Sequence, residues 1–280
     1  MLPMTTEAFA PAKINLTLHV TGQRSDSYHL LDSLVVFGSV GDRLWLAHGD
    51  SMSMEITGPF AQGVPADARN LVWRAAEVAG VTGHITLEKN LPHGAGLGGG
   101  SADAAALLRS LYGDRVTDGI GLAQTLALGA DVPVCMSAVP QRMRGIGGAL
   151  DRIWPVPELH IVLANPRVPV PTSEVFTRLE RKDNRPMAPV LKTNDLSAFT
   201  AWLGTQRNDL QSPAIAFAPV IGEVLDALQG ALIVRMSGSG STCFGIYPDA
   251  AAASDAASRI SAGHPDWWVV AARTVGALPS

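Results

Sequence analysis

Residues 91–101 are the part of this sequence whose residue types most clearly suggest chemistry, and they read Leu-Pro-His-Gly-Ala-Gly-Leu-Gly-Gly-Gly-Ser. Five of the seven residues from Gly94 to Gly100 are glycine, so the backbone can turn tightly and bring its N–H groups close to a ligand. The alanines and leucines between Ala102 and Leu111 have helical spacing. A glycine-rich turn that enters a helix offers unpaired amide donors and the positive end of the helix dipole. We therefore predict a cradle for the phosphates of a nucleotide.

Other interpretations of the glycine stretch fit the sequence less well. A flexible connector would not lead so directly into a regular helix. A phosphate loop of the Walker A type is excluded, because Ser101 and not lysine follows the last glycine. Gly94-x-Gly96-x-x-Gly99 does match the dinucleotide pattern, but residues 88–92 separate it from the predicted strand that should lead straight into it. Dinucleotide binding therefore stays a minor alternative.

The composition limits the kind of protein that carries this stretch. A chain of 280 residues with 47% hydrophobic content can bury a sizeable core in two lobes. Its charged content of 16% and net charge of -4 argue against nucleic acid as a partner. Cys135 and Cys243 have no metal or redox spacing, which favours free thiols in a reducing cytoplasm. The sequence shows no secretory signal and no apolar run long enough to span a membrane, so we expect a cytoplasmic protein with no membrane partner.

Hydrophobic periodicity predicts strands and helices in both halves of the chain. The alternation from Ile14 to Val20 indicates a half-buried strand. Further strands are expected at residues 33–37, 43–47, 52–57, 84–87, 160–164, 231–236, 243–247 and 267–272. Helices are expected at residues 70–78, 102–111, 119–128 and 249–261, from residue 173, and twice more after residue 192. Residues 153–157, Ile-Trp-Pro-Val-Pro, form a stiff joint that we take as the boundary between domains 1–154 and 155–280, each an α+β lobe.

Five pieces of the sequence have an order and spacing typical of one enzyme family. They are Pro11-Ala-Lys-Ile-Asn-Leu16, Gly22-x-Arg-x-Asp-x-Tyr-His29, the loop Pro92–Ala102, Leu128-Gly-Ala-Asp-Val-Pro133 and Ser237-Gly-Ser-Gly-Ser241. With these pieces the chain resembles the GHMP small-molecule kinases over nearly its whole length. The resemblance implies the α+β, two-lobed GHMP kinase fold. Its N-terminal lobe would bind ATP and contain a left-handed βαβ unit, and its C-terminal lobe would be an α/β sandwich. ATP, with Mg²⁺, and the substrate would meet in the cleft between the lobes.

Two of the pieces narrow the expected substrate. Tyr28-His29 and Gly-Ala-Asp-Val-Pro133 are similar to the pieces found in family members that phosphorylate the tertiary 2-hydroxyl of a cytidine diphosphate-linked methylerythritol, in the non-mevalonate isoprenoid pathway. The resemblance thus implies an ATP-dependent kinase for this small molecule, working as a monomer or weak homodimer. Another kinase of the family, acting on homoserine, mevalonate or a sugar, and a non-catalytic sensor on the same fold are the alternatives.

The resemblance also implies roles for individual residues. Lys13 and Asp131 match the catalytic pair, in which Asp131 would orient the substrate hydroxyl as much as accept its proton. The predicted helix C-terminus before Asp131 disfavours a second negative charge, and the charge of a nearby Lys13 would outweigh that effect. The ATP-binding candidates are Asn70, Lys89, Pro92, His93, Gly94, Ala95, Gly96, Leu97, Gly98, Gly99, Gly100, Ser101 and Ala102, with Ser101 also a possible Mg²⁺ ligand. The substrate-binding candidates are Asn15, Tyr28, His29, Thr172, Phe176, Gly238 and Gly240.

The side chains of Tyr28, Phe176 and His29 suit a pyrimidine base. Aromatic rings stack on such a base, and a histidine can hydrogen-bond the ring edge that separates cytosine from uracil. Asp103 falls in the predicted first turn of the loop helix, where we favour a role in complementing the dipole over metal ligation. Arg142 and Arg144 could face a substrate diphosphate or solvent, and the sequence does not decide between the two.

Overall fold

The computed structural model describes residues 5–112 and 120–276, and these residues form two compact units. The first unit comprises residues 5–12, 40–93, 98–112 and 120–138, and the second comprises residues 13–39, 94–97 and 139–276. Two strands, β1 (Thr5–Asn15) and β3 (His29–His48), contribute residues to both units. The glycine stretch is divided in the same way, since Gly94–Leu97 belongs to the second unit and the residues from Gly98 onward belong to the first.

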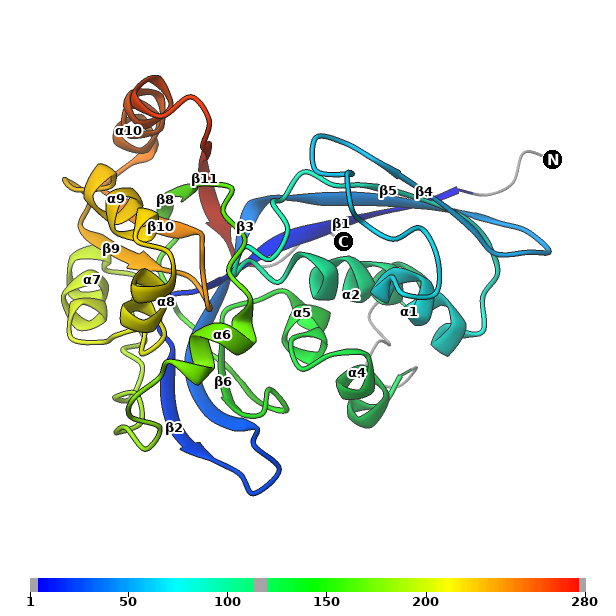
Figure 1. Ribbon diagram of the computed structural model, residues 1–280, viewed down its shortest axis with the longest axis horizontal. Helices are drawn as coiled ribbons and strands as arrows, with labels where there is room; N and C mark the ends of the chain where they lie inside the picture. Colours follow the sequence, from blue (N-terminus) through cyan, green and yellow to red (C-terminus); the bar gives the residue numbers. More distant parts are fainter. Residues whose placement is uncertain (1–4, 113–119, 277–280) are drawn as a thin grey trace. The chain divides into compact units, whose positions relative to one another are not determined.

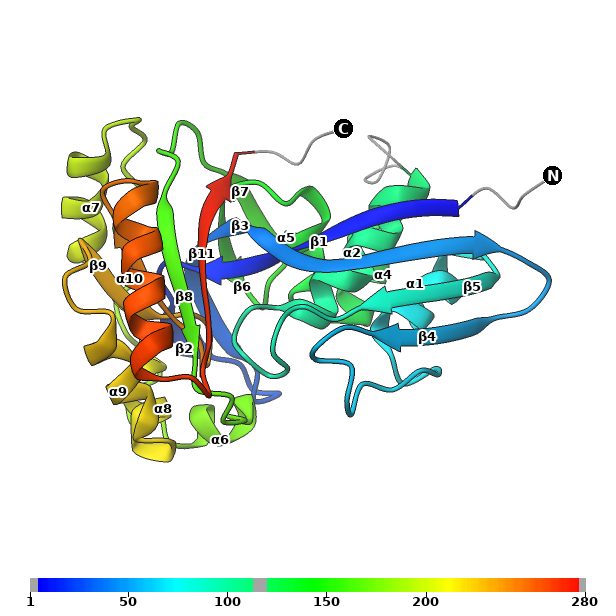
Figure 2. The same cartoon turned by 90° about the horizontal axis from the view of Figure 1, so that it is seen from above.

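In the first unit, helices lie against one face of a sheet (Figure 1, Figure 2). The strand order is β4 (Ser53–Thr57), β5 (Gly83–Glu88) and β3, with β1 also paired to β3. β5 is antiparallel to β3 and parallel to β4. Because α1 (Leu71–Ala79) connects β4 to β5, these three elements form a βαβ unit, whose handedness stays a prediction. The other helices of this unit are α2 (Gly99–Tyr112), α4 (Leu122–Leu128) and α5 (Val132–Ser137).

The second unit is built on an antiparallel sheet with the order β3, β11 (Trp268–Val275), β8 (His160–Asn165), β10 (Cys243–Tyr247) and β9 (Ile233–Met236). Three further strands belong to the N-terminal part of β3: β2 (His19–Gln23) and β6 (Gln141–Gly145) pair with it, and β7 (Ala149–Arg152) pairs with β6. The helices are α6 (Thr172–Thr177), α7 (Leu196–Gly204), α8 (Gln211–Phe217), α9 (Val220–Ala227) and α10 (Ala250–Gly263).

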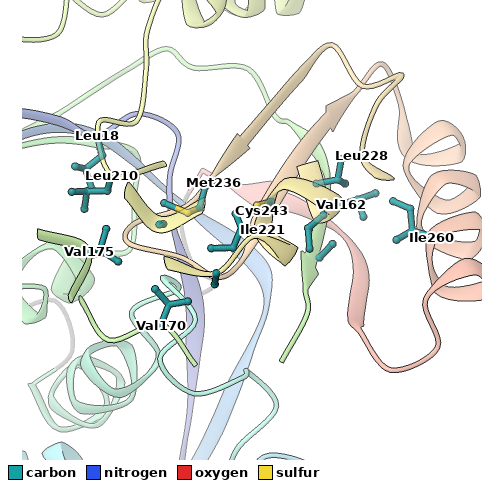
Figure 3. Packing of buried hydrophobic residues seen from close by; sticks show 14 of the residues in the cluster. Leu18, Val162, Val170, Val175, Leu210, Ile221, Leu228, Met236, Cys243 and Ile260 are labelled. Atoms are coloured by element: carbon teal, nitrogen blue, oxygen red, sulfur yellow. The ribbon is translucent and has the colours of Figure 1, made fainter. Parts of the chain in front are cut away.

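Alternate residues of the central strands build the core of the second unit. Val162 in β8 and Cys243 in β10 point to one face of the sheet, where they join Ile221 of α9 and Ile260 of α10 in one buried cluster (Figure 3). All four side chains are buried, and complete burial of an aliphatic side chain contributes about 1.5–3 kcal/mol. This packed layer supports the turn that joins β9 to β10.

Most elements lie where the sequence predicts them. β4, β5, β8, β9, β10, β11, α1, α2, α4, α6 and α10 begin and end within a few residues of the expected ranges. Helix α1 shows why its prediction holds, because Asn70 caps its first turn and Gly80 ends it in the left-handed conformation. Residue 119, where we place the start of the helix that ends at Leu128, lies outside the described residues.

The structure differs from the sequence predictions in four places. Three helices, α7, α8 and α9, lie between residues 192 and 231, where two are expected. Residues 33–37 and 43–47 belong to one strand of 20 residues and not to two. Residues 14–20 are not a single half-buried strand. They join the end of β1 to the start of β2, and the polar Asn15 and His19 are as buried as Ile14 and Val20. The hairpin of β6 and β7 and the short helix α5 are not predicted at all, because their sequences contain few apolar residues at regular spacing or are too short.

The two units interleave along the chain, and the boundary between residues 154 and 155 stays a prediction. Of the helices within residues 5–112 and 120–276, none combines the length and the apolar character that a membrane crossing requires.

Candidate active site

The C-terminal half of the glycine stretch forms the beginning of α2. The first bond of this helix runs from the amide of Ala102 to the carbonyl of Gly98, at 2.8 Å. The amides of Gly99, Gly100 and Ser101 therefore have no acceptor inside the helix. Three such donors at the positive end of a helix dipole are the arrangement that binds phosphate groups.

The N-terminal half of the stretch, in the second unit, is fixed by close backbone packing. Gly94 and Gly96 have φ of +56° and +71°, a conformation that glycine adopts at little cost. A Cβ on Gly96 would lie 2.2 Å from the carbonyl oxygen of Ser237. The hydroxyl of Ser237 donates to the carbonyl of Gly96 at 2.9 Å, and the amide of Thr242 donates to the carbonyl of Ala95 at 3.1 Å. The two glycine motifs of the sequence thus form one hydrogen-bonded structure.

The turn Ser237–Thr242, which contains Gly238 and Gly240, is held in place by neighbouring side chains. Asn208 donates from Nδ2 to the carbonyls of Met236 and Gly238, both at 2.8 Å. The hydroxyls of Thr172 and Ser239 share a hydrogen bond of 2.8 Å. The structure therefore brings three of the substrate-binding candidates, Thr172, Gly238 and Gly240, to one turn.

The end of β1 adds Lys13 and Asn15 to the same part of the second unit. The amide of Lys13 donates to the carbonyl of Leu97 at 2.9 Å, and the amide of Asn15 donates to the hydroxyl of Ser237 at 3.1 Å. The Nδ2 of Asn15 donates to Ser33 at 2.8 Å, but its Oδ1 is buried and has no hydrogen-bond partner within the described residues. An unpaired buried acceptor costs about 1–3 kcal/mol, so this oxygen is a place where a ligand hydroxyl would be favoured.

Asp131 lies in the first unit, between two helices. α4 ends at Leu128, as predicted, but Asp131 is also the N-cap residue of α5, whose first amides its side chain does not bond. Asp131 therefore lies between the C-terminus of α4 and the N-terminus of α5, whereas the sequence predicts only the first of these helix ends. Ser101 lies next to the same turn, since a Cβ on Gly129 would be 3.8 Å from its hydroxyl oxygen.

Lys89 is enclosed by two carboxylates beneath the start of α2. Its ammonium contacts Asp42 and Asp103, the latter at 2.6 Å, and the three side chains are no more than 5% exposed. A Cβ on Gly99 would lie 3.4 Å from this ammonium. Burial alone would lower the pKa of Lys89, but the charges of Asp103 and Asp42 outweigh it and raise the pKa. Asp103 lies beyond the first turn of α2, which begins at Gly99, so the prediction that it complements the helix dipole there is wrong.

The side chain of Asn70 is also engaged in local structure. Its Oδ1 accepts from the amide of Val72 at 2.9 Å, and its Nδ2 donates to the carbonyl of Pro65 at 2.8 Å. Asn70 thereby starts α1. Pro92 and His93 precede the glycines in the first unit, where the ring of His93 makes an edge contact with Phe60 at 6.4 Å between centroids.

Three aromatic candidates for base recognition lie in the second unit. The rings of His29 and Phe176 stack with centroids 4.4 Å apart, and Tyr28 is 61% exposed. The Nε2 of His29 is buried and has no hydrogen-bond partner within the described residues. Burial, and after it the charge of Lys182, lowers the pKa of His29. A neutral imidazole with an unused ring nitrogen can recognise the hydrogen-bonding edge of a base.

The two arginines that the sequence leaves open are both bound to carboxylates. Arg142 donates to Asp32 through Nε and Nη2, at 2.8 and 2.6 Å, and also to the carbonyl of Met187. Arg144 forms an exposed ion pair with Asp151 at 2.5 Å.

Sequence reasoning does not identify three residues that hold this site together. Ser237 lies within a recognised piece but receives no role there, and Asn208 and Asp42 are not singled out. The sequence does contain a signal for Asp42, because it is a charged residue within a long and largely apolar segment. The structure shows that its side chain is completely buried. A charge in that position requires a buried partner of opposite sign.

Comparison with known proteins places the chain in a family. The profile for the GHMP kinases N terminal domain matches residues 70–138, and that for GHMP kinases C terminal matches residues 187–266. A relative from Ruegeria pomeroyi, named 4-diphosphocytidyl-2-C-methyl-D-erythritol kinase, is 52% identical over 279 residues, covering 97% of this chain and 100% of the relative. The chain belongs to the GHMP kinase family.

Other members of the GHMP kinase family support this assignment. A relative of the same name from Cereibacter sphaeroides is 53% identical over 97% of this chain and 100% of its own length. A crystal structure of 4-(cytidine 5'-diphospho)-2C-methyl-D-erythritol kinase superposes with a TM-score of 0.76 at 34% identity, covering 96% of this chain and 99% of that one. Homoserine kinase from Cytophaga hutchinsonii has the same fold, with a TM-score of 0.65 at 19% identity over 97% of this chain and 96% of that one. The predicted GHMP kinase fold is confirmed.

Proposed function

We propose that this chain is an ATP-dependent kinase that phosphorylates the 2-hydroxyl of 4-diphosphocytidyl-2-C-methyl-D-erythritol, in the methylerythritol phosphate pathway to isoprenoid precursors. The identity of 52% over 97% of the chain to a relative of that name supports the choice of substrate. The observation that carries the reaction is the junction at Ser237, which hydrogen-bonds both the glycine stretch and the end of β1 where Asn15 lies. A monomer or weak homodimer stays a prediction.

In this proposal the glycine stretch binds ATP and two ionisable residues act on the alcohol. The amides of Gly99, Gly100 and Ser101 bind the phosphates. Asp131 orients the substrate hydroxyl and takes its proton, while the ammonium of Lys13 offsets the negative charge that spreads over the transferred phosphoryl group. Because the transition state of such a transfer is loose, Asp131 need not be a strong base.

Magnesium fits the donors at the head of α2. Within the described residues, no three side chains of His, Cys, Asp or Glu gather in a way that could hold a metal ion. Mg²⁺ does not need such a cage, since it is usually bound by one or two protein groups together with phosphate oxygens and water. We propose the hydroxyl of Ser101 as one of those groups. When bound, the ion would neutralise part of the phosphate charge.

The aromatic group in the second unit would recognise the cytosine. Tyr28 and Phe176 offer ring faces for stacking, and His29 offers the unpaired Nε2 to the base edge. Since the rings of His29 and Phe176 are 4.4 Å apart, there is no room for a base between these two, and we propose that cytosine stacks on another face. The unpaired Oδ1 of Asn15 would accept a hydrogen bond from a hydroxyl of the substrate.

A coupled assay of ATP consumption tests the proposed function. It would compare 4-diphosphocytidyl-2-C-methyl-D-erythritol with mevalonate and homoserine at equal concentrations. We expect turnover with the cytidylylated substrate alone, and competition by CDP but not by UDP. Turnover of mevalonate or homoserine, or indifference to CDP, would contradict the choice of substrate. Absence of ATP turnover with every alcohol would contradict the kinase itself.

A further inference from the structure

The side chain of Asn15 is held at one end and unpaired at the other. Its Nδ2 donates to the hydroxyl of Ser33 at 2.8 Å, whereas its Oδ1 is buried and has no hydrogen-bond partner within the described residues. The two ends of a carboxamide have nearly the same size, so a turn of the group by about 180° would exchange donor and acceptor without a change of shape. Which end of Asn15 faces a ligand therefore depends on the group that holds the other end.

The hydroxyl of Ser33 has one proton, and the main chain uses it. The Oγ of Ser33 donates to the carbonyl oxygen of Thr17, which can only accept. Because that proton is committed, Ser33 offers Asn15 an acceptor and not a donor. The end of the Asn15 amide that faces Ser33 must therefore be the NH2 group, and the oxygen lies at the opposite end.

The surroundings of Ser33 keep this pattern of hydrogen bonds in place. Ser33 lies in β3, in the part of the strand that pairs with β6, so its backbone is fixed by the sheet. The hydroxyl of Thr17 accepts from the amide of Leu34 at 2.8 Å and donates to the sulfur of Met187 at 3.0 Å, so the proton of Thr17 is also committed. Asn15, Thr17 and Ser33 are no more than 1% exposed, and bulk water does not compete for their hydrogen bonds.

A second serine holds the backbone of Asn15 in the same way. The hydroxyl of Ser237 donates to the carbonyl of Gly96 at 2.9 Å and accepts from the amide of Asn15 at 3.1 Å. Asn15 is thus held twice by hydroxyl groups whose own protons go to carbonyls, once through its main chain and once through its side chain. Its Oδ1 remains as an acceptor in a fixed position, and a donor on a ligand would remove the cost of leaving it unpaired.

We propose that Ser33 is a positioning residue that directs the acceptor end of Asn15 toward the substrate, so that Asn15 selects a substrate hydroxyl that donates a hydrogen bond. The identity of the substrate in this inference rests on the proposed function. The direction of the Asn15 amide follows from the hydrogen bonds alone. A substrate group that can only accept would meet the Oδ1 of Asn15 with no proton between the two atoms, and the site would reject it.

Fluorinated analogues of the substrate test this selection. In each analogue, fluorine replaces one hydroxyl of the methylerythritol part of 4-diphosphocytidyl-2-C-methyl-D-erythritol, and fluorine cannot donate a hydrogen bond. Affinity would be measured by calorimetry without ATP. For the unmodified protein we expect one analogue to bind at least about tenfold more weakly than the substrate, because it leaves a buried acceptor unpaired. If every analogue bound as tightly as the substrate, Asn15 would not select a donor, and the proposal would be overturned.

Removal of the Ser33 hydroxyl should weaken the discrimination against that analogue. In Ser33→Ala the amide of Asn15 can turn and present its NH2 group to fluorine, so the ratio of the two affinities should fall to no more than about threefold. Ser33→Thr keeps the hydroxyl and should keep the ratio of the unmodified protein. The matched control is Thr200→Val, which removes a buried hydroxyl whose hydrogen bonds stay within α7, and it should also leave the ratio unchanged. A purely structural role of Ser33 would weaken both ligands alike, so an unchanged ratio in Ser33→Ala would overturn the proposal.

NMR of the unmodified protein without ligand tests the direction of the amide itself. The side-chain NH2 protons of Asn15 should show strong nuclear Overhauser contacts to the β-protons of Ser33 and exchange slowly with water, since this end of the amide is buried and bonded. Weak contacts to Ser33 together with fast exchange would overturn the proposal. This measurement needs neither substrate nor a variant, so it remains decisive if Ser33→Ala does not fold. If the contacts are present and the substrate does not bind, the proposed function fails, whereas the direction of the Asn15 amide is upheld.

Discussion

The two halves of the glycine stretch are supported by different chemistry. Gly94–Leu97 is held by neutral groups, chiefly the hydroxyl of Ser237 and the amide of Thr242. The other half begins α2, and its Gly99 lies instead next to the buried ions of Lys89 and Asp42. One continuous loop thus depends on hydrogen bonds between uncharged groups at one end and on a desolvated ion pair at the other.

The difference between these supports follows from what each half has to do. A neutral network costs little to bury once every group is paired, and it fixes backbone positions closely. A buried ion pair costs more to desolvate, but breaking it by removing one partner leaves an uncompensated charge, so its geometry is strongly enforced. We infer that the ionic support fixes the amides that we propose bind phosphate, whereas the neutral support joins the loop to residues that we propose bind the alcohol.

The largest expected effect concerns Lys13 and Asp131, the two residues that we propose act on the alcohol. Lys13→Ala and Asp131→Asn should each lower kcat at least about 10³-fold, because removal of charge stabilisation or of a proton acceptor has effects of this order. ATP affinity should stay within a few-fold of the unmodified protein. Steady-state kinetics and calorimetry measure the two quantities. If the variants lowered ATP affinity and left kcat unchanged, Lys13 and Asp131 would act on ATP binding and not on the alcohol, which would contradict the proposal.

Removal of the ionic support should have the next largest effect. Lys89→Met leaves Asp42 and Asp103 buried without a cation, and we expect the free energy of unfolding to fall by about 3–5 kcal/mol. Chemical denaturation measures this change. Arg144→Met, which breaks the exposed ion pair with Asp151, is the matched control and should cost no more than about 1 kcal/mol. A cost for Lys89→Met as small as that of the control would contradict the ionic support.

Removal of the neutral support should cost less. Ser237→Ala deletes the donor to Gly96 and the acceptor for Asn15, and we expect a loss of about 1–3 kcal/mol in unfolding free energy. Because this hydroxyl joins the loop to β1, KM should rise for both ATP and the alcohol. Ser110→Ala is the control. It removes a hydroxyl whose hydrogen bond stays within α2, to Leu107, and it should change both KM values by no more than about twofold. If Ser237→Ala raised KM for ATP alone, the proposal that Ser237 joins the glycine stretch to the alcohol-binding residues would be contradicted.

The smallest expected effect is a pH dependence of KM that arises at His29. This residue lies in the second unit, as does the neutral network. The pKa of His29 is lowered by burial and by Lys182, so the ring stays uncharged at pH values where an ordinary histidine begins to protonate. KM for the cytidylylated substrate should therefore be flat from pH 8 to about pH 6.5 and rise below it, as the ring gains a proton. His29→Gln should lack the rise. A KM that already changes between pH 8 and pH 7 would contradict a neutral His29.

The parts of the fold that the sequence predicts are those decided by neighbouring residues. Asn70 caps α1 from an adjacent position, and Asp249 caps α10 in the same way. The conformation of the glycine stretch follows from the missing Cβ atoms at Gly94, Gly96 and Gly98, all of which have positive φ. Local chemistry of this kind is visible in a single sequence.

The parts that cannot be predicted are pairings between distant segments. Asp42 and Asp103 both meet Lys89 only because β3, α2 and the end of β5 come together in the fold, and Arg142 meets Asp32 only because β6 pairs with β3. In both cases the local sequence around the charged residue is equally consistent with a side chain that is exposed to solvent. The 20-residue strand β3 is hidden for a related reason, since the polar residues that suggest a break, Ser39 and Asp42, accept hydrogen bonds from the distant amides of Arg273 and Leu91. Tertiary context decides these positions, and spacing does not reveal it.

A double-mutant cycle in single-turnover kinetics tests the central claim most directly, namely that Lys13 and Asp131 act together on one alcohol. The rate of phosphoryl transfer to 4-diphosphocytidyl-2-C-methyl-D-erythritol would be measured for the unmodified protein, Lys13→Ala, Asp131→Asn and the double variant, all saturated with ATP. Residues that act as a unit have strongly non-additive effects, so we predict a double variant about as slow as the slower single one. If the two losses simply multiply, Lys13 and Asp131 act independently, and the account is contradicted.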